Sequence, residues 1–149
     1  MWNNPAEAVS PGLTFQRRRH AGLMDSLEIL VVDDEESICL LLNDALVRFG
    51  HSVTTCQDGA TAVRVAAERS FDLVFLDIRM PGMGGLEVLK KLRELQPEAT
   101  FVMITGYAKS DIIDESLRSG ASACLCKPFS LTEVKKLLAE IQSGAPISA

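Results

Sequence analysis

Residues 28–36 read Glu-Ile-Leu-Val-Val-Asp-Asp-Glu-Glu, a short apolar run that ends in a run of acidic residues. An unbroken run of β-branched and leucine residues of this length is typical of a strand buried on both faces, as in a parallel sheet. Runs of the same kind recur at 52–56, 73–76, 101–104 and 123–126. The sequence therefore predicts an α/β domain with five strands, the first of them at 28–32.

Amphipathic stretches lie between these runs and predict crossover helices. After the first run, apolar residues recur at three- and four-residue spacing from Ile38 to Phe49, and Gly50 follows as a helix stop. Three further helices are expected at 60–69, 86–95 and 111–119. A fifth follows the capping-box sequence that begins at Ser130, and it runs to residue 142. The pattern is that of a doubly wound sheet with helices on both faces.

Length and charge limit the classes of function. A chain of 149 residues with 47% hydrophobic content can bury one sizeable core. Its formal net charge of −5 disfavours nucleic-acid binding, and the basic cluster Arg17–Arg19 lies outside the patterned region. The apolar runs are far shorter than the roughly 20 residues of a membrane-spanning helix. We expect one cytoplasmic domain that contacts neither nucleic acid nor membrane.

The domain is expected at 26–143, between a flexible leader at 1–25 and a short tail at 144–149. The leader has no sustained period. Met24 lies directly before the first patterned segment, and we hypothesise that the leader is a mis-assigned start; an intact mass that included residues 1–23 would reject this. The residues after the last helix are too few for an output domain, which predicts a stand-alone, single-domain protein.

Four cysteines occur, and no two of them have the C-x-x-C spacing of zinc sites. They are Cys39, Cys56, Cys124 and Cys126. Cysteines in apolar runs are most often reduced, buried small residues, and that is the interpretation favoured here.

Polar residues follow four of the five runs, and in an open parallel sheet ligands bind at the carboxyl ends of the strands. The residues at these ends are Asp33 and Asp34, then Asp77, Thr105 and Lys127. Clustered carboxylates repel one another unless a cation compensates, and an all-oxygen ligand set is what Mg²⁺ prefers. A divalent metal, a hydroxyl and an ammonium together suit phosphoryl transfer. A carboxylate is also a competent phosphoryl acceptor.

Each of these residues also has an ordinary structural explanation. Asp34 is suited to cap the following helix, and Thr105 to form a turn. Lys127 is equally consistent with a solvated charge before Pro128. Taken singly, the structural explanation is favoured. Taken together it is improbable, because four strands would have to place the required residue types at one edge by chance.

Four segments resemble the receiver domain of bacterial two-component response regulators. They are 29–36, 72–83 (Asp-Leu-Val-Phe-Leu-Asp-Ile-Arg-Met-Pro-Gly-Met), 102–106 (Val-Met-Ile-Thr-Gly) and 120–129, and the resemblance spans residues 27–142. Their order and spacing make the match specific. It implies a flavodoxin-like fold, with a five-stranded parallel sheet in the order 2-1-3-4-5 and five helices.

The same resemblance assigns roles at the site. It implies that Asp77 is phosphorylated, and that Asp34, Asp77 and the backbone carbonyl of Arg79 bind Mg²⁺. Asp33 would act mainly through metal-bound water. Arg79 itself carries a long cation that is expected to tune the lifetime of the phosphoryl group.

The resemblance further implies that Lys127 pairs with the phosphoryl group while Thr105 moves toward it, and that Lys127 and Pro128 are joined by a cis peptide bond. Two positions depart from the family pattern: the aromatic residue usual three positions before this lysine is Cys124 here, and, more mildly, Arg79 places its long cation two residues after Asp77. The usual aromatic switch is therefore in question. Tyr107 is the nearest aromatic residue. Two interpretations of it stay open: it takes over part of the gating, or it is an ordinary aromatic residue of a loop.

The resemblance implies a signalling domain that catalyses its own phosphorylation and dephosphorylation. It does not imply an enzyme that acts on a separate substrate. The donor would be a sensor histidine kinase or a histidine phosphotransfer protein. The output would be contact with a downstream protein, made by a monomer or a phosphorylation-dependent dimer. Two alternatives stay open: a phosphorylation-independent adaptor, and a Mg²⁺-dependent phosphatase of small esters. The phosphatase predicts Asp-x-Asp, whereas Ile78 and Arg79 follow Asp77.

Overall fold

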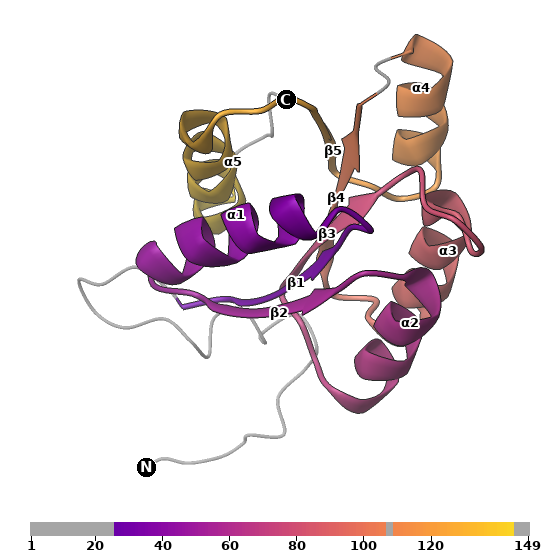
Figure 1. The fold of residues 1–149 in the computed structure, drawn as a ribbon, viewed down its shortest axis with the longest axis horizontal. Helices are drawn as coiled ribbons and strands as arrows, with labels where there is room; N and C mark the ends of the chain where they lie inside the picture. The colour runs from indigo at the N-terminus through magenta and orange to yellow at the C-terminus, as the bar shows by residue number, and fades with distance from the viewer. Residues whose placement is uncertain (1–25, 107–108, 145–149) are drawn as a thin grey trace.

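Strands and helices alternate along the computed structural model, which describes residues 26–106 and 109–144 (Figure 1). The strands are β1 (Glu28–Val32), β2 (Ser52–Cys56), β3 (Leu73–Asp77), β4 (Thr100–Thr105) and β5 (Ala123–Cys126). The helices are α1 (Glu36–Arg48), α2 (Gly59–Glu68), α3 (Gly85–Leu95), α4 (Ser110–Arg118) and α5 (Leu131–Ser143). All strand pairs are parallel, in the order β2-β1-β3-β4-β5. The predicted doubly wound α/β sheet, its order and its five helices are confirmed.

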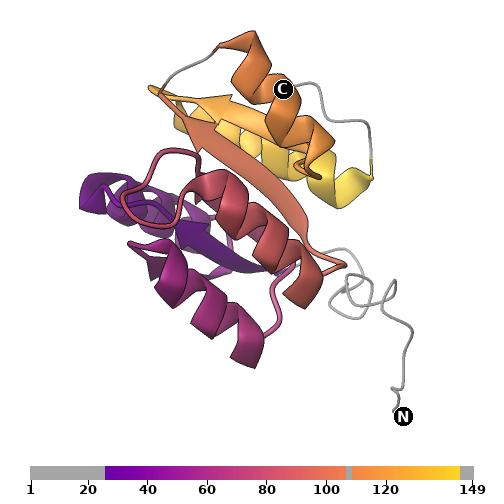
Figure 2. The ribbon, with the colours of Figure 1, turned by 90° about the vertical axis from the view of Figure 1, so that its right-hand side faces the viewer.

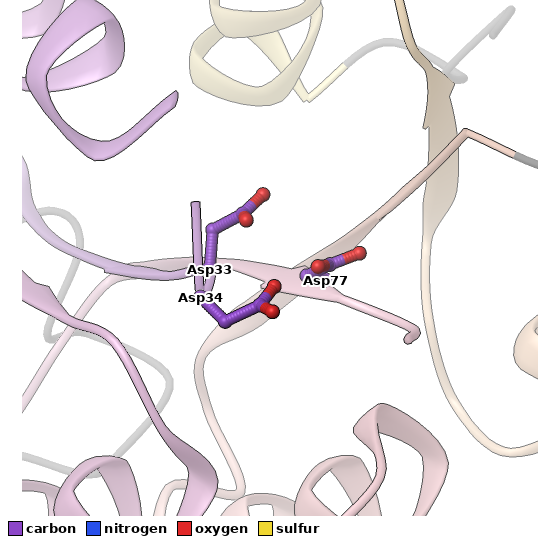
Figure 3. Close-up of side chains that lie close together, drawn as sticks. All are labelled: Asp33, Asp34 and Asp77. Atoms are coloured by element: carbon purple, nitrogen blue, oxygen red, sulfur yellow. The ribbon is translucent and has the colours of Figure 1, made fainter. Parts of the chain in front are cut away.

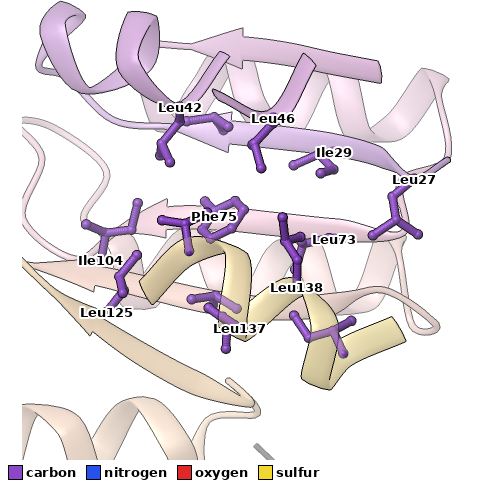
Figure 4. Packing of buried hydrophobic residues seen from close by; sticks show 14 of the residues in the cluster. Leu27, Ile29, Leu42, Leu46, Leu73, Phe75, Ile104, Leu125, Leu137 and Leu138 are labelled. Carbon is purple, nitrogen blue, oxygen red and sulfur yellow. The ribbon is translucent and has the colours of Figure 1, made fainter. Parts of the chain in front are cut away.

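Helices cover both faces of the sheet. Helices α1 and α5 lie on one face, and α2, α3 and α4 lie on the other (Figures 1 and 2). Every residue of β3 is buried, and alternate side chains enter two separate apolar clusters. Phe75 enters the first cluster, among leucines of α1 and α5 (Figure 4). Leu76 enters the second. Burial on both faces explains why the strands appear in the sequence as unbroken apolar runs.

The capping box predicted at Ser130 is present at the start of α5. Ser130 Oγ accepts a hydrogen bond from the backbone N–H of Glu133 at 3.1 Å, and Glu133 Oε1 accepts one from the backbone N–H of Ser130 at 2.8 Å. These two bonds satisfy donors that the first turn of the helix leaves open. The peptide bond between Lys127 and Pro128 is cis, as the family resemblance implied.

The sheet extends slightly further toward the predicted site than the apolar runs indicated. Strand β3 includes Asp77, which pairs with Ile104, and β4 includes Thr105, which pairs with Cys126. The runs ended one residue too early because a polar residue at a strand end breaks the apolar pattern without breaking the hydrogen-bonded ladder. These two residues are consequently held by sheet hydrogen bonds and not by loops.

All four cysteines are free thiols, as expected, but they are not all buried. Cys39 and Cys56 are buried, Cys124 is half-buried and Cys126 is exposed. The expectation of burial is wrong for Cys126 because it ends β5, which is an edge strand. Tyr107, the leader and all of the predicted tail except Gly144 lie outside the described residues. Within those residues, none of the helices has the length and apolar character needed to cross a membrane.

Candidate functional site

The strand ends bring together three of the predicted carboxylates. Asp33 and Asp34 follow β1, Asp77 ends the neighbouring β3, and one oxygen from each lies within 4.8 Å of the others (Figure 3). Asp33 and Asp77 are buried, whereas Asp34 is exposed. This set is therefore an acidic cluster at the edge of the sheet that the sequence predicted.

Asp33 is fixed by the turn that it forms. Its backbone N–H donates to the carbonyl of Cys56 at 3.1 Å, and its Oδ1 accepts from the backbone N–H of Glu35 at 2.9 Å. The helix that follows has Glu35, not Asp34, at its N-cap, and no side chain caps it. The suggestion that Asp34 caps this helix is wrong, because the Asp33 turn places Asp34 one residue too early.

Lys127, which directly follows β5, brings its ammonium to this cluster. Its Nζ is 2.5 Å from Glu35 Oε1, 3.0 Å from Asp33 Oδ2 and 3.7 Å from Asp77 Oδ2. Burial acts to lower the pKa of Lys127, but hydrogen bonds to Glu35 and Asp33 and the negative charges nearby outweigh it. The pKa of Lys127 is therefore raised, and the ammonium stays charged.

Asp77 is held in an unfavourable environment for a carboxylate. Burial, followed by the negative charge of Asp33, raises the pKa of Asp77 from 3.8 to about 7, although Lys127 and the backbone N–H of Arg79 act in the opposite direction. That N–H donates to Asp77 Oδ1 at 3.4 Å. The single ammonium of Lys127 thus compensates only part of the negative charge.

A divalent cation fits this arrangement. The three clustered carboxylates offer hard oxygen ligands of the kind that Mg²⁺ and Ca²⁺ take. Burial, and after it the negative charge of Asp33, raises the pKa of Asp77, and a bound cation would offset both effects. The acidic pocket is thus a divalent-metal site by the chemistry of its donors.

The other predicted residues lie at the neighbouring strand ends. Thr105 is buried, and its carbonyl accepts a hydrogen bond from the backbone N–H of Lys127 at 2.7 Å. Cys124 lies further back on β5, half-buried and in contact with Ser116 of α4. Burial raises the pKa of the Cys124 thiol. The structure therefore places Thr105 beside the cluster and Cys124 between the sheet and α4.

Glu35 is a site residue that sequence reasoning missed. It makes the shortest contact of Lys127 in the site, across 92 positions of sequence. The only available signal was its place as the third acidic residue in the run after β1. That signal was weak because exposed acidic residues are common at the start of a helix.

Comparison with known proteins agrees with the fold and shows the family. The family model described as "Response regulator receiver domain" matches residues 29–139. Sporulation initiation phosphotransferase F of Bacillus subtilis is 33% identical over 108 residues, which cover 72% of this chain and 87% of that protein.

A second relative is longer than this chain. The transcriptional regulatory protein ZraR of Klebsiella oxytoca is 36% identical over 124 residues, 83% of this chain, but the match spans only 28% of that protein. Among solved structures, a response regulator of Burkholderia pseudomallei with a phosphorylated aspartic acid, a calcium ion and citrate has a TM-score of 0.71. It is 27% identical, and the match covers 80% of this chain and 72% of that one.

Proposed function

Because this chain belongs to the response regulator receiver domain family, we propose that it is a phospho-acceptor in which Asp77 receives a phosphoryl group from a histidine. The donor is a sensor histidine kinase or a histidine phosphotransfer protein. The observation that carries the proposal is the buried Asp77 carboxylate at a strand end, with a second buried carboxylate and an ammonium beside it. The phosphorylated aspartic acid in the Burkholderia pseudomallei structure supports the same chemistry here.

The proposed reaction is an in-line displacement. A carboxylate oxygen of Asp77 attacks the phosphorus of a phosphohistidine, so that an O–P bond forms while the P–N bond breaks. The electron pair of the P–N bond goes to the imidazole nitrogen, which takes up a proton from solvent. Asp77 must be ionised to attack, and Lys127 favours the ionised form.

The proposed metal is Mg²⁺, held by Asp34, Asp77 and the carbonyl of Arg79, with Asp33 acting through water. When bound, it would supply positive charge to the phosphoryl oxygens. Lys127 and Thr105 would donate hydrogen bonds to those oxygens. Water later cleaves the acyl phosphate and returns the carboxylate and inorganic phosphate.

The proposed output is a protein contact, made through a change in the segment after Thr105, α4 and β5 that phosphorylation favours. Cys124 lies in that region, in contact with α4. Helix α1, which begins directly beside the acidic cluster, exposes Leu40 in its second turn by 61%. Exposed apolar side chains near the site are suited to contact the phosphoryl donor protein.

Incubation with acetyl phosphate and Mg²⁺, followed by phosphate-affinity electrophoresis, tests the proposal. We expect a shifted band in the wild type and in Asp44→Asn, which neutralises an exposed carboxylate on α1, but none in Asp77→Asn. The alternatives give different results. An adaptor would show no shifted band, and a phosphatase would show steady hydrolysis of a small phosphate ester. Either result would overturn the proposal.

A further inference from the structure

The ammonium of Lys127 is nearer to Glu35 than to the proposed phospho-acceptor. Its Nζ lies 2.5 Å from Glu35 Oε1 but 3.7 Å from Asp77 Oδ2. The first contact is a charge-assisted hydrogen bond, and the second distance is too long for a hydrogen bond. In this structure, then, the group expected to bind the phosphoryl oxygens contacts two other carboxylates, those of Glu35 and Asp33, more closely than that of Asp77.

Glu35 is fixed in place by its own backbone. Its N–H donates to Asp33 Oδ1, and Asp33 Oδ2 in turn lies 3.0 Å from Lys127 Nζ. Its carbonyl accepts hydrogen bonds from the backbone N–H groups of Ile38 and Cys39, so it is the N-cap of α1. The Glu35 side chain caps nothing, and it is turned toward Lys127 instead. Glu35 thus occupies the N-cap position of α1, but its side chain contacts Lys127 and does not cap the helix.

The contact is also easily exchanged. The Glu35 side chain is 56% exposed, whereas that of Lys127 is 16% exposed. An ion pair with one half-exposed partner contributes little to stability, because water solvates that partner well when it is released. A phosphoryl group brings roughly 1.5 to 2 negative charges, which is more than the carboxylate carries. A phosphoryl group on Asp77 would therefore displace Glu35 from Lys127.

From this competition we propose that Glu35 is a positioning residue: it holds the Lys127 ammonium away from Asp77 and so slows phosphorylation. This deepens the proposed function and rests on it. As the phosphoryl group approaches Asp77, Lys127 leaves Glu35 and turns to the phosphoryl oxygens. Each phosphorylation then carries the cost of breaking the Glu35 contact, and removing the carboxylate removes that cost.

The first test compares initial rates of phosphorylation by acetyl phosphate at fixed Mg²⁺. We expect Glu35→Gln to react about 5-fold faster than the wild type, as for the loss of a partly exposed charge pair. Glu36→Gln is the matched control, since it neutralises the adjacent exposed carboxylate at the first position of α1. It should change the rate by less than about 2-fold. A Glu35→Gln rate no higher than that of Glu36→Gln would overturn the proposal.

The second test needs no phosphorylation. Acylation of lysines by a water-soluble reagent, followed by mass spectrometry, reports how free each ammonium is, with Lys135 as the internal reference. We expect Lys127 to react faster in Glu35→Gln than in the wild type or Glu36→Gln. An unchanged reactivity of Lys127 would overturn the proposal. If no variant takes up phosphate, the proposed function fails, whereas faster acylation would still support the hold of Glu35 on Lys127.

Discussion

At the scale of single residues, the site favours chemistry at the expense of stability. Asp77 is a buried carboxylate beside the buried carboxylate of Asp33, and Lys127 compensates them only in part. Burying like charges together is unfavourable for folding. The same burial keeps the Asp77 carboxylate out of water, which suits the phosphoryl transfer proposed for it. The two effects predict opposite results for one substitution.

In the absence of divalent cations, we expect Asp77→Asn to be more stable than the wild type, with a free energy of unfolding that is higher by about 1 kcal/mol. The amide removes the repulsion with Asp33 and the cost of burying a charge, while it keeps nearly the same shape. Urea unfolding with a metal chelator present measures the difference. Asp44→Asn, on the exposed surface of α1, should stay within about 0.5 kcal/mol of the wild type. If Asp77→Asn is less stable than the wild type, repulsion between the carboxylates of Asp33 and Asp77 does not destabilise the fold.

His51 gives the fold a separate dependence on pH. It is buried, and its Nδ1 accepts a hydrogen bond from the backbone N–H of Leu27 at 3.0 Å, which requires the neutral ring. Burial lowers the pKa of His51 below its ordinary value of 6.5. As the pH falls through 6.5, the unfolded chain therefore takes up a proton that the folded protein does not, and stability is lost.

The replacement His51→Asn tests this, because its amide oxygen can accept the same hydrogen bond but does not titrate. Between about pH 7.5 and 5.5, we expect the wild type to lose about 1 kcal/mol more unfolding free energy than His51→Asn. Chemical denaturation at a series of pH values gives both curves, and the carboxylates common to both proteins cancel in the difference. Parallel curves would mean that His51 does not titrate in this range.

At the scale of elements, the position of Asp77 depends on how closely α3 approaches the end of β3. The backbone N–H of Gly85 donates to the carbonyl of Ile78 at 2.9 Å. A Cβ at Gly85 would lie 2.2 Å from the carbonyl oxygen of Asp77 and 2.6 Å from the Cα of Ile78, distances that backbone atoms cannot accommodate without moving. A Cβ on the preceding Gly84 would meet nothing within 4 Å, so the chain offers a matched pair of positions.

Gly85→Ala should therefore destabilise the domain by at least about 2 kcal/mol, because α3 or the acceptor segment must shift. Gly84→Ala adds the same methyl group one residue earlier and should stay within about 1 kcal/mol of the wild type. Thermal unfolding followed by circular dichroism compares them. Where Gly85→Ala still folds, slower phosphorylation of Asp77 is expected as well. Equal stabilities for the two variants would show that α3 can shift away from the end of β3 without a cost in stability.

At the scale of the whole molecule, the sequence predicted the layered architecture because each element buries its side chains in a regular period. The doubly buried β3 appears as an unbroken apolar run, and the one-sided α1 as a three- and four-residue repeat. The cluster of carboxylates followed from topology alone, since parallel strands end at one edge. The Glu35 contact with Lys127 could not be predicted, because it depends on how two loops 92 residues apart orient their side chains.

The same topology predicts that a metal at the sheet edge contributes to stability. If a divalent cation binds the folded domain but not the unfolded chain, Mg²⁺ at ten times its dissociation constant should raise the unfolding free energy by about 1.4 kcal/mol. Asp34→Asn removes the most exposed of the three clustered carboxylates and should abolish most of this gain, whereas Asp44→Asn should keep it. Urea unfolding with and without Mg²⁺, reversed by a chelator, measures the effect. An equal gain in Asp34→Asn and the wild type would place the cation elsewhere, and the charge compensation proposed for phosphoryl transfer would lose its physical basis.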